Sequence, residues 1–187
     1  MKIFLDAGHG GKDPGAIFKG FREKDITLAI VLELRRMMQS ELCEHTIVTS
    51  RVLDEYVTLI RRVRRANTER CDVFLSIHCN ADPDHDAPDF KEASGAEVWV
   101  YPKSERAAAL ADRIGKGFRK VFPRYPWRGV KETEHFYVLK KTAMVAALVE
   151  VGFIDSHHDA AFLSQAETQR QIARILLDAV AVPAVLF

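Results

Sequence analysis

The stretch KIFLDAGHGGKDPGA, residues 2–16, indicates the fold of the chain and raises the first question about its function. Its apolar start, residues 3–5, is typical of a short buried strand. A glycine-rich loop follows, with one histidine, His9, at its centre. Glycines let a backbone turn tightly and approach another group closely. Because one imidazole does little chemistry alone, the loop predicts partner side chains elsewhere in the chain.

Strand-like and helix-like segments alternate along the rest of the sequence. Segment 72–77 is almost entirely apolar, as expected of a central strand covered on both faces, whereas segment 23–42 repeats its apolar residues at helical spacing. The predicted strands are residues 2–5, 45–49, 72–77, 97–101 and 146–151, and the predicted helices are residues 23–42, 56–66, 104–122 and 165–182. This alternation predicts an α/β sheet with helices on both faces.

Size and composition indicate one globular domain over residues 1–187. The chain is 48% hydrophobic, which suits a single complete core. Its net charge of +1 gives no electrostatic reason to expect nucleic acid as a partner. No run approaches the roughly 18 apolar residues of a membrane span, so none is expected. The oligomeric state is left open.

Cysteine content and the N-terminus bear on where the chain is made. Its three cysteines, Cys43, Cys71 and Cys79, are too few and too scattered for a disulfide framework and suit a reducing cytoplasm. The first apolar run is three residues long, so it is no signal peptide. We expect a chain made in the cytoplasm and released by lysis, or one from which a leader has been removed.

Three further polar residues accompany strand or helix boundaries. His78 follows the apolar run 72–77, Glu150 follows AALV, and Glu23 opens the first long helix. Functional sites of α/β sheets gather at the carboxyl ends of the strands. Two imidazoles and a carboxylate form a familiar catalytic zinc set that leaves the fourth position to water. Taken singly, each residue also has a structural interpretation; Glu23, for example, suits the first turn of a helix.

Seven motifs occur in a fixed order that resembles a known family. They are DAGHGGKDPGA at 6–16, EKD at 23–25, TSR at 49–51, L-x-x-R-x-x-x-A-N at 59–67, SIHCNA at 76–81, RGVK at 128–131 and LVEVGFI at 148–154. Together they resemble the zinc-dependent N-acetylmuramoyl-L-alanine amidases of the Amidase_3 type. The resemblance covers nearly the whole chain.

The resemblance implies a site, a reaction and a sheet. It implies Zn²⁺ bound by His9, Glu23 and His78, and a catalytic role for Glu150. The implied reaction cleaves the amide between N-acetylmuramic acid and L-alanine in peptidoglycan, so peptidoglycan or a muropeptide is the expected partner and the cell wall the place of action. The implied fold is a twisted, mostly parallel sheet of about six strands between helices.

Several other features received structural interpretations. Cys79 stands where the family commonly has a small residue, and alternation along the strand turns it away from the face of His78, so we expect it to pack in the core. A phosphate loop is excluded because Asp6 and Asp13 replace the required glycine and hydroxyl. The arginines of RRVRR, residues 61–65, are interpreted as a solvated helix face, with weak attraction to anionic wall polymers left open. His157 and His158 are expected to be exposed at a helix start.

The segment 82–94 is interpreted as a surface loop. Its thirteen residues are too few for a regulatory helix with two connections, so we expect activity without an activator. The alternative is that an acidic residue of this loop, Asp84, Asp86 or Asp89, reaches the zinc.

Two classes of function stay open at this stage. The first is a zinc amidase, favoured because all four key positions carry the expected residue types. The second is a non-catalytic wall-binding module that keeps the fold. Phage endolysin, host autolysin and excised catalytic domain all stay open as origins, and the missing leader favours an endolysin-like protein slightly. The sequence says nothing of stem-peptide preference.

Overall fold

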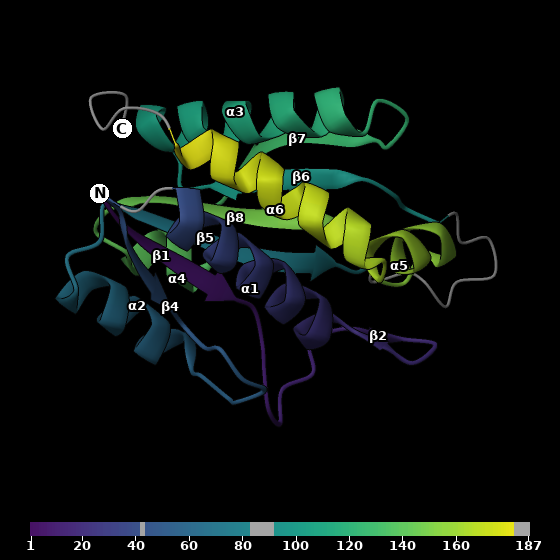
Figure 1. The fold of residues 1–187 in the computed structure, drawn as a ribbon, viewed down its shortest axis with the longest axis horizontal. Coiled ribbons are helices and arrows are strands. Elements are labelled where there is room, and N and C mark those ends of the chain that lie inside the picture. Colours follow the sequence, from purple (N-terminus) through teal and green to yellow (C-terminus); the bar gives the residue numbers. More distant parts are fainter. Residues whose placement is uncertain (42–43, 83–91, 182–187) are drawn as a thin grey trace.

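A six-stranded sheet forms the centre of the protein (Figure 1). The computed structural model describes residues 1–41, 44–82 and 92–181. In spatial order the strands are β4 (Thr46–Thr49), β1 (Lys2–Ala7), β5 (Val73–Asn80), β8 (Val145–Phe153), β6 (Ala96–Val100) and β7 (Trp127–Glu132). The first four run parallel, β6 runs antiparallel to β8, and β7 runs parallel to β6. The expected mostly parallel sheet of about six strands is therefore confirmed, with two strands reversed at one edge.

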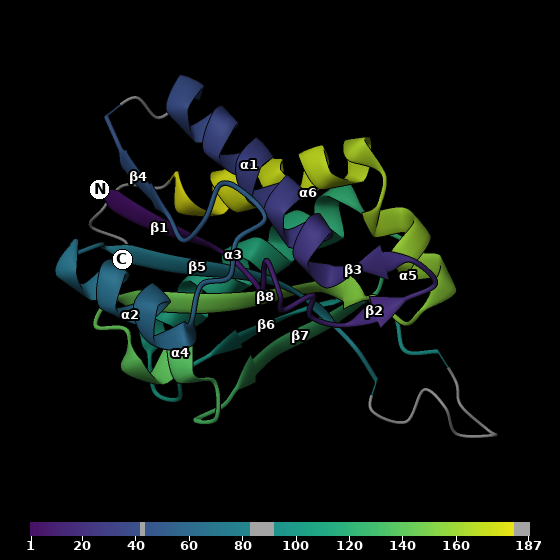
Figure 2. The same cartoon turned by 90° about the horizontal axis from the view of Figure 1, so that it is seen from below.

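Helices cover both faces of this sheet, as predicted. One face carries α1 (Glu23–Glu41), α3 (Glu105–Val121) and α6 (Ala166–Val180), and the other carries α2 (Leu59–Thr68) and the short α4 (Tyr137–Lys141). Figure 2 shows the sheet between α1 and α6 on one side and α2 and α4 on the other. The remaining elements are α5 (His157–Leu163) and the small hairpin of β2 (Ile17–Phe18) and β3 (Phe21–Arg22).

Alternation along the strands divides the core into two layers. Odd-numbered residues of β1, β5 and β8, such as Leu5 and Leu75, pack under α1, α3 and α6. Even-numbered residues face α2 and α4, where Phe4 and Phe74 stack with ring centroids 5.2 Å apart. Toward the carboxyl ends of the same strands, this second face becomes polar: it carries Asp6, Ser76, His78 and Glu150. The fold therefore places these polar side chains on the α2/α4 side.

Three elements were not predicted from the sequence. The strand β7, WRGVKE, lies at the sheet edge and alternates between half-buried and exposed residues, so it lacks an apolar pattern. The helix α4 has only five residues, and the hairpin strands have two each. The strand β8 also extends two residues beyond the predicted end at Val151, to Phe153, and is buried along its whole length.

The cysteine and membrane expectations have simple outcomes. Cys79 is buried in the layer under α1, α3 and α6, on the face opposite His78, as its alternation predicted. Cys71 is buried in the other layer, and Cys43 lies outside the described residues. Among the helices that the structure describes, none combines the length and apolar character needed to cross a membrane.

Candidate metal centre

Two loops bring His9 and Glu23 to the end of β5. The loop after β1 contains His9 at a positive φ of 57°, and its backbone returns to α1, which begins at Glu23. Gly8 lies against the ring of His78: a Cβ there would come within 2.5 Å of the imidazole. Gly15 lies equally close to the Glu23 carboxylate. The glycines of the opening motif thus permit the contacts between these loops and the strand.

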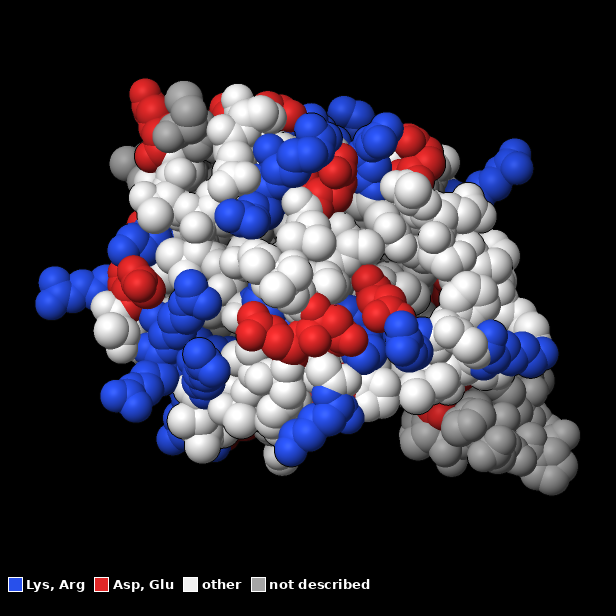
Figure 3. Space-filling model, turned by 60° about the horizontal axis from the view of Figure 1, so that its bottom comes forward, with Lys and Arg blue, Asp and Glu red and all other residues white. Residues whose placement is uncertain are grey.

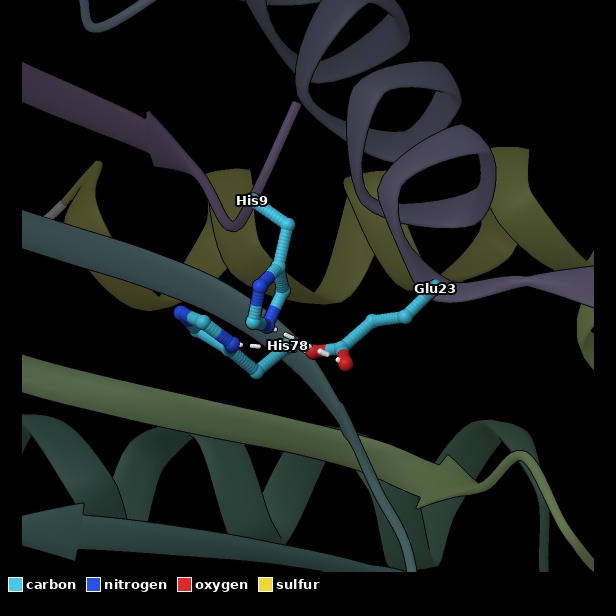
Figure 4. Close-up of side chains that lie close together, drawn as sticks. All are labelled: His9, Glu23 and His78. Carbon is cyan, nitrogen blue, oxygen red and sulfur yellow. Dashed lines mark hydrogen bonds and ion pairs between the residues drawn. The ribbon is translucent and has the colours of Figure 1, made fainter. Parts of the chain in front are cut away.

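His9, Glu23 and His78 point toward one another (Figure 4). Their nearest ligand atoms all lie within 4.8 Å of one another. Glu23 lies between the two imidazoles, with Oε2 3.1 Å from His9 Nε2 and Oε1 2.9 Å from His78 Nδ1. The sequence placed these three residues at strand and helix ends, and the structure brings them together.

Neighbouring groups fix the orientation of these side chains. The carboxylate of Asp13 lies 3.0 Å from His9 Nδ1, which leaves His9 Nε2 directed at the centre of the cluster. Glu23 Oε2 accepts the backbone N–H of Ala16, and its Oε1 accepts that of Cys79, each at 3.0 Å. A carboxylate on the outer nitrogen of a histidine is the usual support of a metal-binding imidazole.

The side chains of the cluster favour each other's charged forms. Burial alone would lower the pKa of His78, but the hydrogen bond and charge of Glu23 outweigh burial and raise it to about 9. Burial likewise opposes ionisation of Glu23, yet hydrogen bonds from His78 and His9 hold its pKa well below the usual range. Two imidazoles and one buried carboxylate fit a zinc ion, because they supply three protein ligands and leave a fourth position open.

Glu150 lies beside this cluster as a buried carboxylate. It is the register partner of His78 on one side and of Glu97 on the other. Its Oε2 has no hydrogen-bond partner among the described residues. Burial, aided by the charges of Glu23 and Glu97, raises the pKa of Glu150 to about 7. A buried carboxylate without a partner is costly and is therefore a candidate for a chemical role.

A cavity of about 330 Å³ opens onto these residues. His9, His78 and Glu150 line it together with Leu59 at the start of α2. The opposite wall comes from residues 135–138, at the start of α4. The cavity therefore lies between the start of α2 and the start of α4, above the strand ends.

Arg62 was wrongly included in the solvated face of α2. Its side chain is 3% exposed and pairs with the carboxylate of Asp6. It also donates to the backbone oxygen of His9 at 2.7 Å, so it links α2 to the loop after β1. Basic side chains do gather over α2, at the left of Figure 3. Arg61 and Arg64 of this helix are exposed, as predicted. The signal for Arg62 was its spacing: it precedes the buried Ala66 by one helical turn.

A second buried carboxylate, Glu97, was not singled out in the sequence. It is 1% exposed, and its Oε2 accepts hydrogen bonds from Arg128 Nε at 2.9 Å and Lys131 Nζ at 2.6 Å. Its Oε1 accepts from Trp99 and Asn80. Burial opposes ionisation of Glu97, but Lys131 and Arg128 outweigh it and lower its pKa. The available signal for Glu97 was its charge at the start of the apolar strand EVWVY, residues 97–101.

The remaining candidates lie away from the cluster or outside the described residues. His157 and His158 are exposed at the start of α5, as predicted, and His157 contacts Glu92. The alternative ligands Asp84, Asp86 and Asp89 lie outside the described residues.

An α/β sheet with a His–Glu–His set and a further carboxylate at its strand ends is the arrangement expected of a metal-dependent hydrolase domain. More specifically, residues 3–182 match the Amidase_3 family, described as N-acetylmuramoyl-L-alanine amidase, and the chain belongs to this family.

Individual relatives agree with the family. The chain is 38% identical over 175 residues to N-acetylmuramoyl-L-alanine amidase CwlM of Bacillus licheniformis, covering 93% of this chain and 65% of the relative. It is 37% identical over 176 residues to the sporulation-specific amidase of Bacillus subtilis, covering 93% and 64%. It thus spans a little less than two thirds of these relatives. The solved structure of amidase AmiC2 of Nostoc punctiforme superposes with a TM-score of 0.87 at 29% identity, covering 97% of this chain and 95% of that one.

Proposed function

We propose that this chain is a zinc-dependent hydrolase that cleaves the amide bond between N-acetylmuramic acid and L-alanine in peptidoglycan. The observation that carries the proposal is the buried, unpartnered carboxylate of Glu150 beside the His9–Glu23–His78 cluster, at a cavity. Family membership supports the substrate, and the place of action is then the cell wall. Residues 1–187 act as a single catalytic domain.

His9, Glu23 and His78 would hold the zinc ion, which, when bound, activates water and polarises the amide carbonyl. Glu150 moves the proton: its carboxylate accepts a proton from the attacking water and then delivers it to the nitrogen of L-alanine as the amide bond breaks. A pKa of about 7 suits both roles near neutral pH, because the group then gains and loses a proton with equal ease.

The geometry favours this enzyme over a non-catalytic wall-binding module. A binding module gains nothing from a carboxylate that is 9% exposed and has an oxygen without a partner. Burial of such a group costs stability, so a chemical role is the better account of Glu150.

The direct test is digestion of purified peptidoglycan with the isolated chain, without any added partner protein. We expect new L-alanine amino termini and no new reducing sugar. New reducing ends, or no products from a zinc-loaded chain, would overturn the proposal. The variant Glu150→Gln keeps the shape of the side chain and removes the base, so it should retain zinc and lose about 10²-fold or more in rate. Near-normal turnover of this variant would exclude the proposed role.

A further inference from the structure

The exposed side of α2 is strongly basic. Figure 3 shows basic side chains gathered over this helix, whose sequence, LIRRVRRANT, contains no acidic residue. Arg61, Arg64 and Arg65 are exposed, and among the described residues none of the three has a carboxylate within ion-pair distance. Arg65 instead donates to the backbone oxygen of Thr49 at 2.8 Å, so its guanidinium is held in place.

Arginines on other helices are neutralised, which sets α2 apart. Arg36 of α1 pairs with Glu33, and Arg174 of α6 pairs with Glu41. The chain as a whole has a net charge of only +1, so the basic side of α2 is a local excess of charge on a nearly neutral protein. Such an excess raises the local surface potential and attracts an anionic partner.

A cavity of about 450 Å³ lies along these arginines, and we call it the basic cavity. The three arginines line it together with the hydroxyls of Thr58 and Thr68. Glu69 also lines it, but its carboxylate lies 3.2 Å from Lys2 Nζ and is compensated there. Arg61 and Arg65 are one helical turn apart, about 6 Å at 1.5 Å per residue. Guanidinium groups at that spacing can bind successive phosphates of a chain, because their planar donors match phosphate oxygens.

The basic cavity adjoins the cavity at Glu150 across the start of α2. Leu59 lines the cavity that contains His78 and Glu150, and its neighbour Ile60 lines the basic cavity. Both side chains are exposed, by 52% and 65%. A polymer that leaves the cavity at Glu150 over these two side chains therefore meets the arginines next.

The form of this surface favours a flexible polyanion over a membrane or a nucleic acid. A membrane-binding helix inserts its apolar face, whereas the apolar face of α2, with Val63 and Ala66, is buried in the core. Surfaces for single-stranded nucleic acid add aromatic side chains for base stacking, and the described residues that line the basic cavity include no aromatic one. Arginines and hydroxyls alone suit a chain that is recognised by its phosphates.

We propose that Arg61, Arg64 and Arg65 bind an anionic cell-wall polymer whose units are joined by phosphodiesters and which is attached to the glycan of the substrate. This inference rests on the proposed function for the place where the polymer is met, the cell wall. An N-acetylated glycan has no charge for the arginines to bind, whereas phosphodiesters attached to it do. The basic side of α2 is thus a second attachment point that keeps the cavity at Glu150 on polymer-bearing wall.

The test compares cell walls with and without the polymer. Gram-positive walls that carry a glycan-linked phosphodiester polymer are divided, and one half is treated with hydrofluoric acid, which cleaves the phosphodiesters and leaves the peptidoglycan. The Glu150→Gln variant is sedimented with each half, so that binding is measured without digestion. We expect about tenfold tighter binding to the untreated walls at low ionic strength, the size of a few exposed ion pairs together. The preference should weaken as ionic strength rises.

Arginine variants, made in the same background, assign the preference to α2. Arg61→Gln/Arg64→Gln should reduce the ratio of the two affinities toward one, and Arg61→Lys/Arg64→Lys should keep it because the charge remains. The matched control is Arg119→Gln/Arg124→Gln, which removes two exposed arginines at and just beyond the end of α3, a helix of the other face. It should keep the ratio. An equal fall in this control, or equal binding to both walls before any arginine is changed, would overturn the inference.

Two further measurements separate the inference from its alternatives. Vesicles of phosphatidylglycerol present phosphates on a lipid surface. Tighter binding to vesicles than to untreated walls at equal phosphate concentration, lost in Arg61→Gln/Arg64→Gln, would assign α2 to a membrane and refute the polymer. Digestion of both walls by the unmodified chain tests the amidase itself. Preferential binding with no new L-alanine amino termini from either wall would keep the polymer site and refute the proposed function. Hydrolysis of both walls without any binding preference would refute the polymer site alone.

Discussion

Gly8 sets the distance between β5 and the loop after β1 that contains His9. Its φ is not positive, so backbone strain does not require glycine there; the space does, because the imidazole of His78 occupies the position of a Cβ. The imidazole of His78, held against the backbone of Gly8, has little freedom to rotate. The rigidity of the metal centre therefore depends on a residue without a side chain.

We expect Gly8→Ala to weaken zinc binding at least tenfold, because the new Cβ would lie 2.5 Å from the His78 ring and force it out of position. Isothermal titration of the metal-free protein measures this affinity. The matched control is Gly20→Ala: Gly20 has a φ of +88° and nothing within 4 Å of its Cβ position. It should lose about 1 kcal/mol of stability through backbone strain and keep its zinc. Unchanged zinc affinity in Gly8→Ala would refute this steric account.

Secondary-structure elements differ in how well the sequence predicted them. The buried strands β1, β5 and β8 have continuous apolar runs, and parallel strands bring their carboxyl ends together, so the meeting of His9, His78 and Glu150 could be anticipated. The strand β7 and helix α4 could not, because one is a half-exposed edge with a bulge and the other is a single short turn of helix. Their places depend on contacts with distant residues.

The same limit applies to the charged residues of the site. Arg62 resembles its exposed neighbours in composition, and its spacing from Ala66 was the only signal we found for it in the sequence. Its pairing with Asp6, 56 positions earlier in the chain, could not be read from that spacing. Glu97 is held in the core by hydrogen bonds from Arg128 and Lys131 of β7. The register between β6 and β7 shifts at this point, and no periodicity in the sequence predicts that shift. Ion pairs between distant segments are properties of the tertiary fold, whereas the ligand positions followed from strand ends.

The attachment of α2 to β1 gives a prediction about stability. Arg62→Met leaves Asp6 buried and unpaired, which should cost about 3–5 kcal/mol of unfolding free energy. For a chain of this size that corresponds to a melting temperature roughly 10 °C lower. Adding Asp6→Asn removes the uncompensated charge, so the double variant should lose less than the sum of the single variants. Additive losses, measured by denaturant titration, would contradict the pairing; Arg61→Met is the exposed control.

The ion pairs of Glu97 on β6 with Arg128 and Lys131 on β7 give a prediction about pH. The pKa of Glu97 is lower in the folded protein than its usual value, so its ion pairs add stability above the unfolded pKa of about 4.3 and lose it as pH falls through the lower folded value. Glu97→Gln should therefore be less stable than wild type by about 2 kcal/mol at pH 7. This difference should shrink below pH of about 4. A constant difference from pH 7 to pH 3 in urea unfolding would contradict the assignment.

The whole molecule divides its two faces between stability and chemistry. Three long helices, α1, α3 and α6, cover one face and enclose most of the buried apolar residues. The other face has two shorter helices and carries the cavity at the strand ends. A densely packed layer thus supports a more open one, and the candidate ligands come from both the sheet and the helices: His78 from β5 and Glu23 from the start of α1.

Metal removal should affect activity and folding together. Zinc held by His9, Glu23 and His78, as proposed, would join the loop after β1, the start of α1 and the strand β5. The metal-loaded chain should therefore have a higher melting temperature than the chelated one, as binding to the native state alone requires. Chelation should abolish hydrolysis, and added Zn²⁺ should restore it. The variant His9→Ala/His78→Ala should contain almost no zinc by elemental analysis. Wild-type zinc content in that variant would refute the assignment of His9 and His78 as zinc ligands.

The alternation of β5 also restricts how the gene can change. His78 faces the cavity and Cys79 the core, so deleting or inserting one codon within this strand would exchange the faces of every residue beyond it. The imidazole would enter an apolar layer and a thiol would stand where a metal ligand belongs. Substitutions of similar size are tolerable at the apolar core positions of β5, but the length of the strand is not adjustable. Differences in length between this chain and its relatives should therefore collect in the connections between strands and helices.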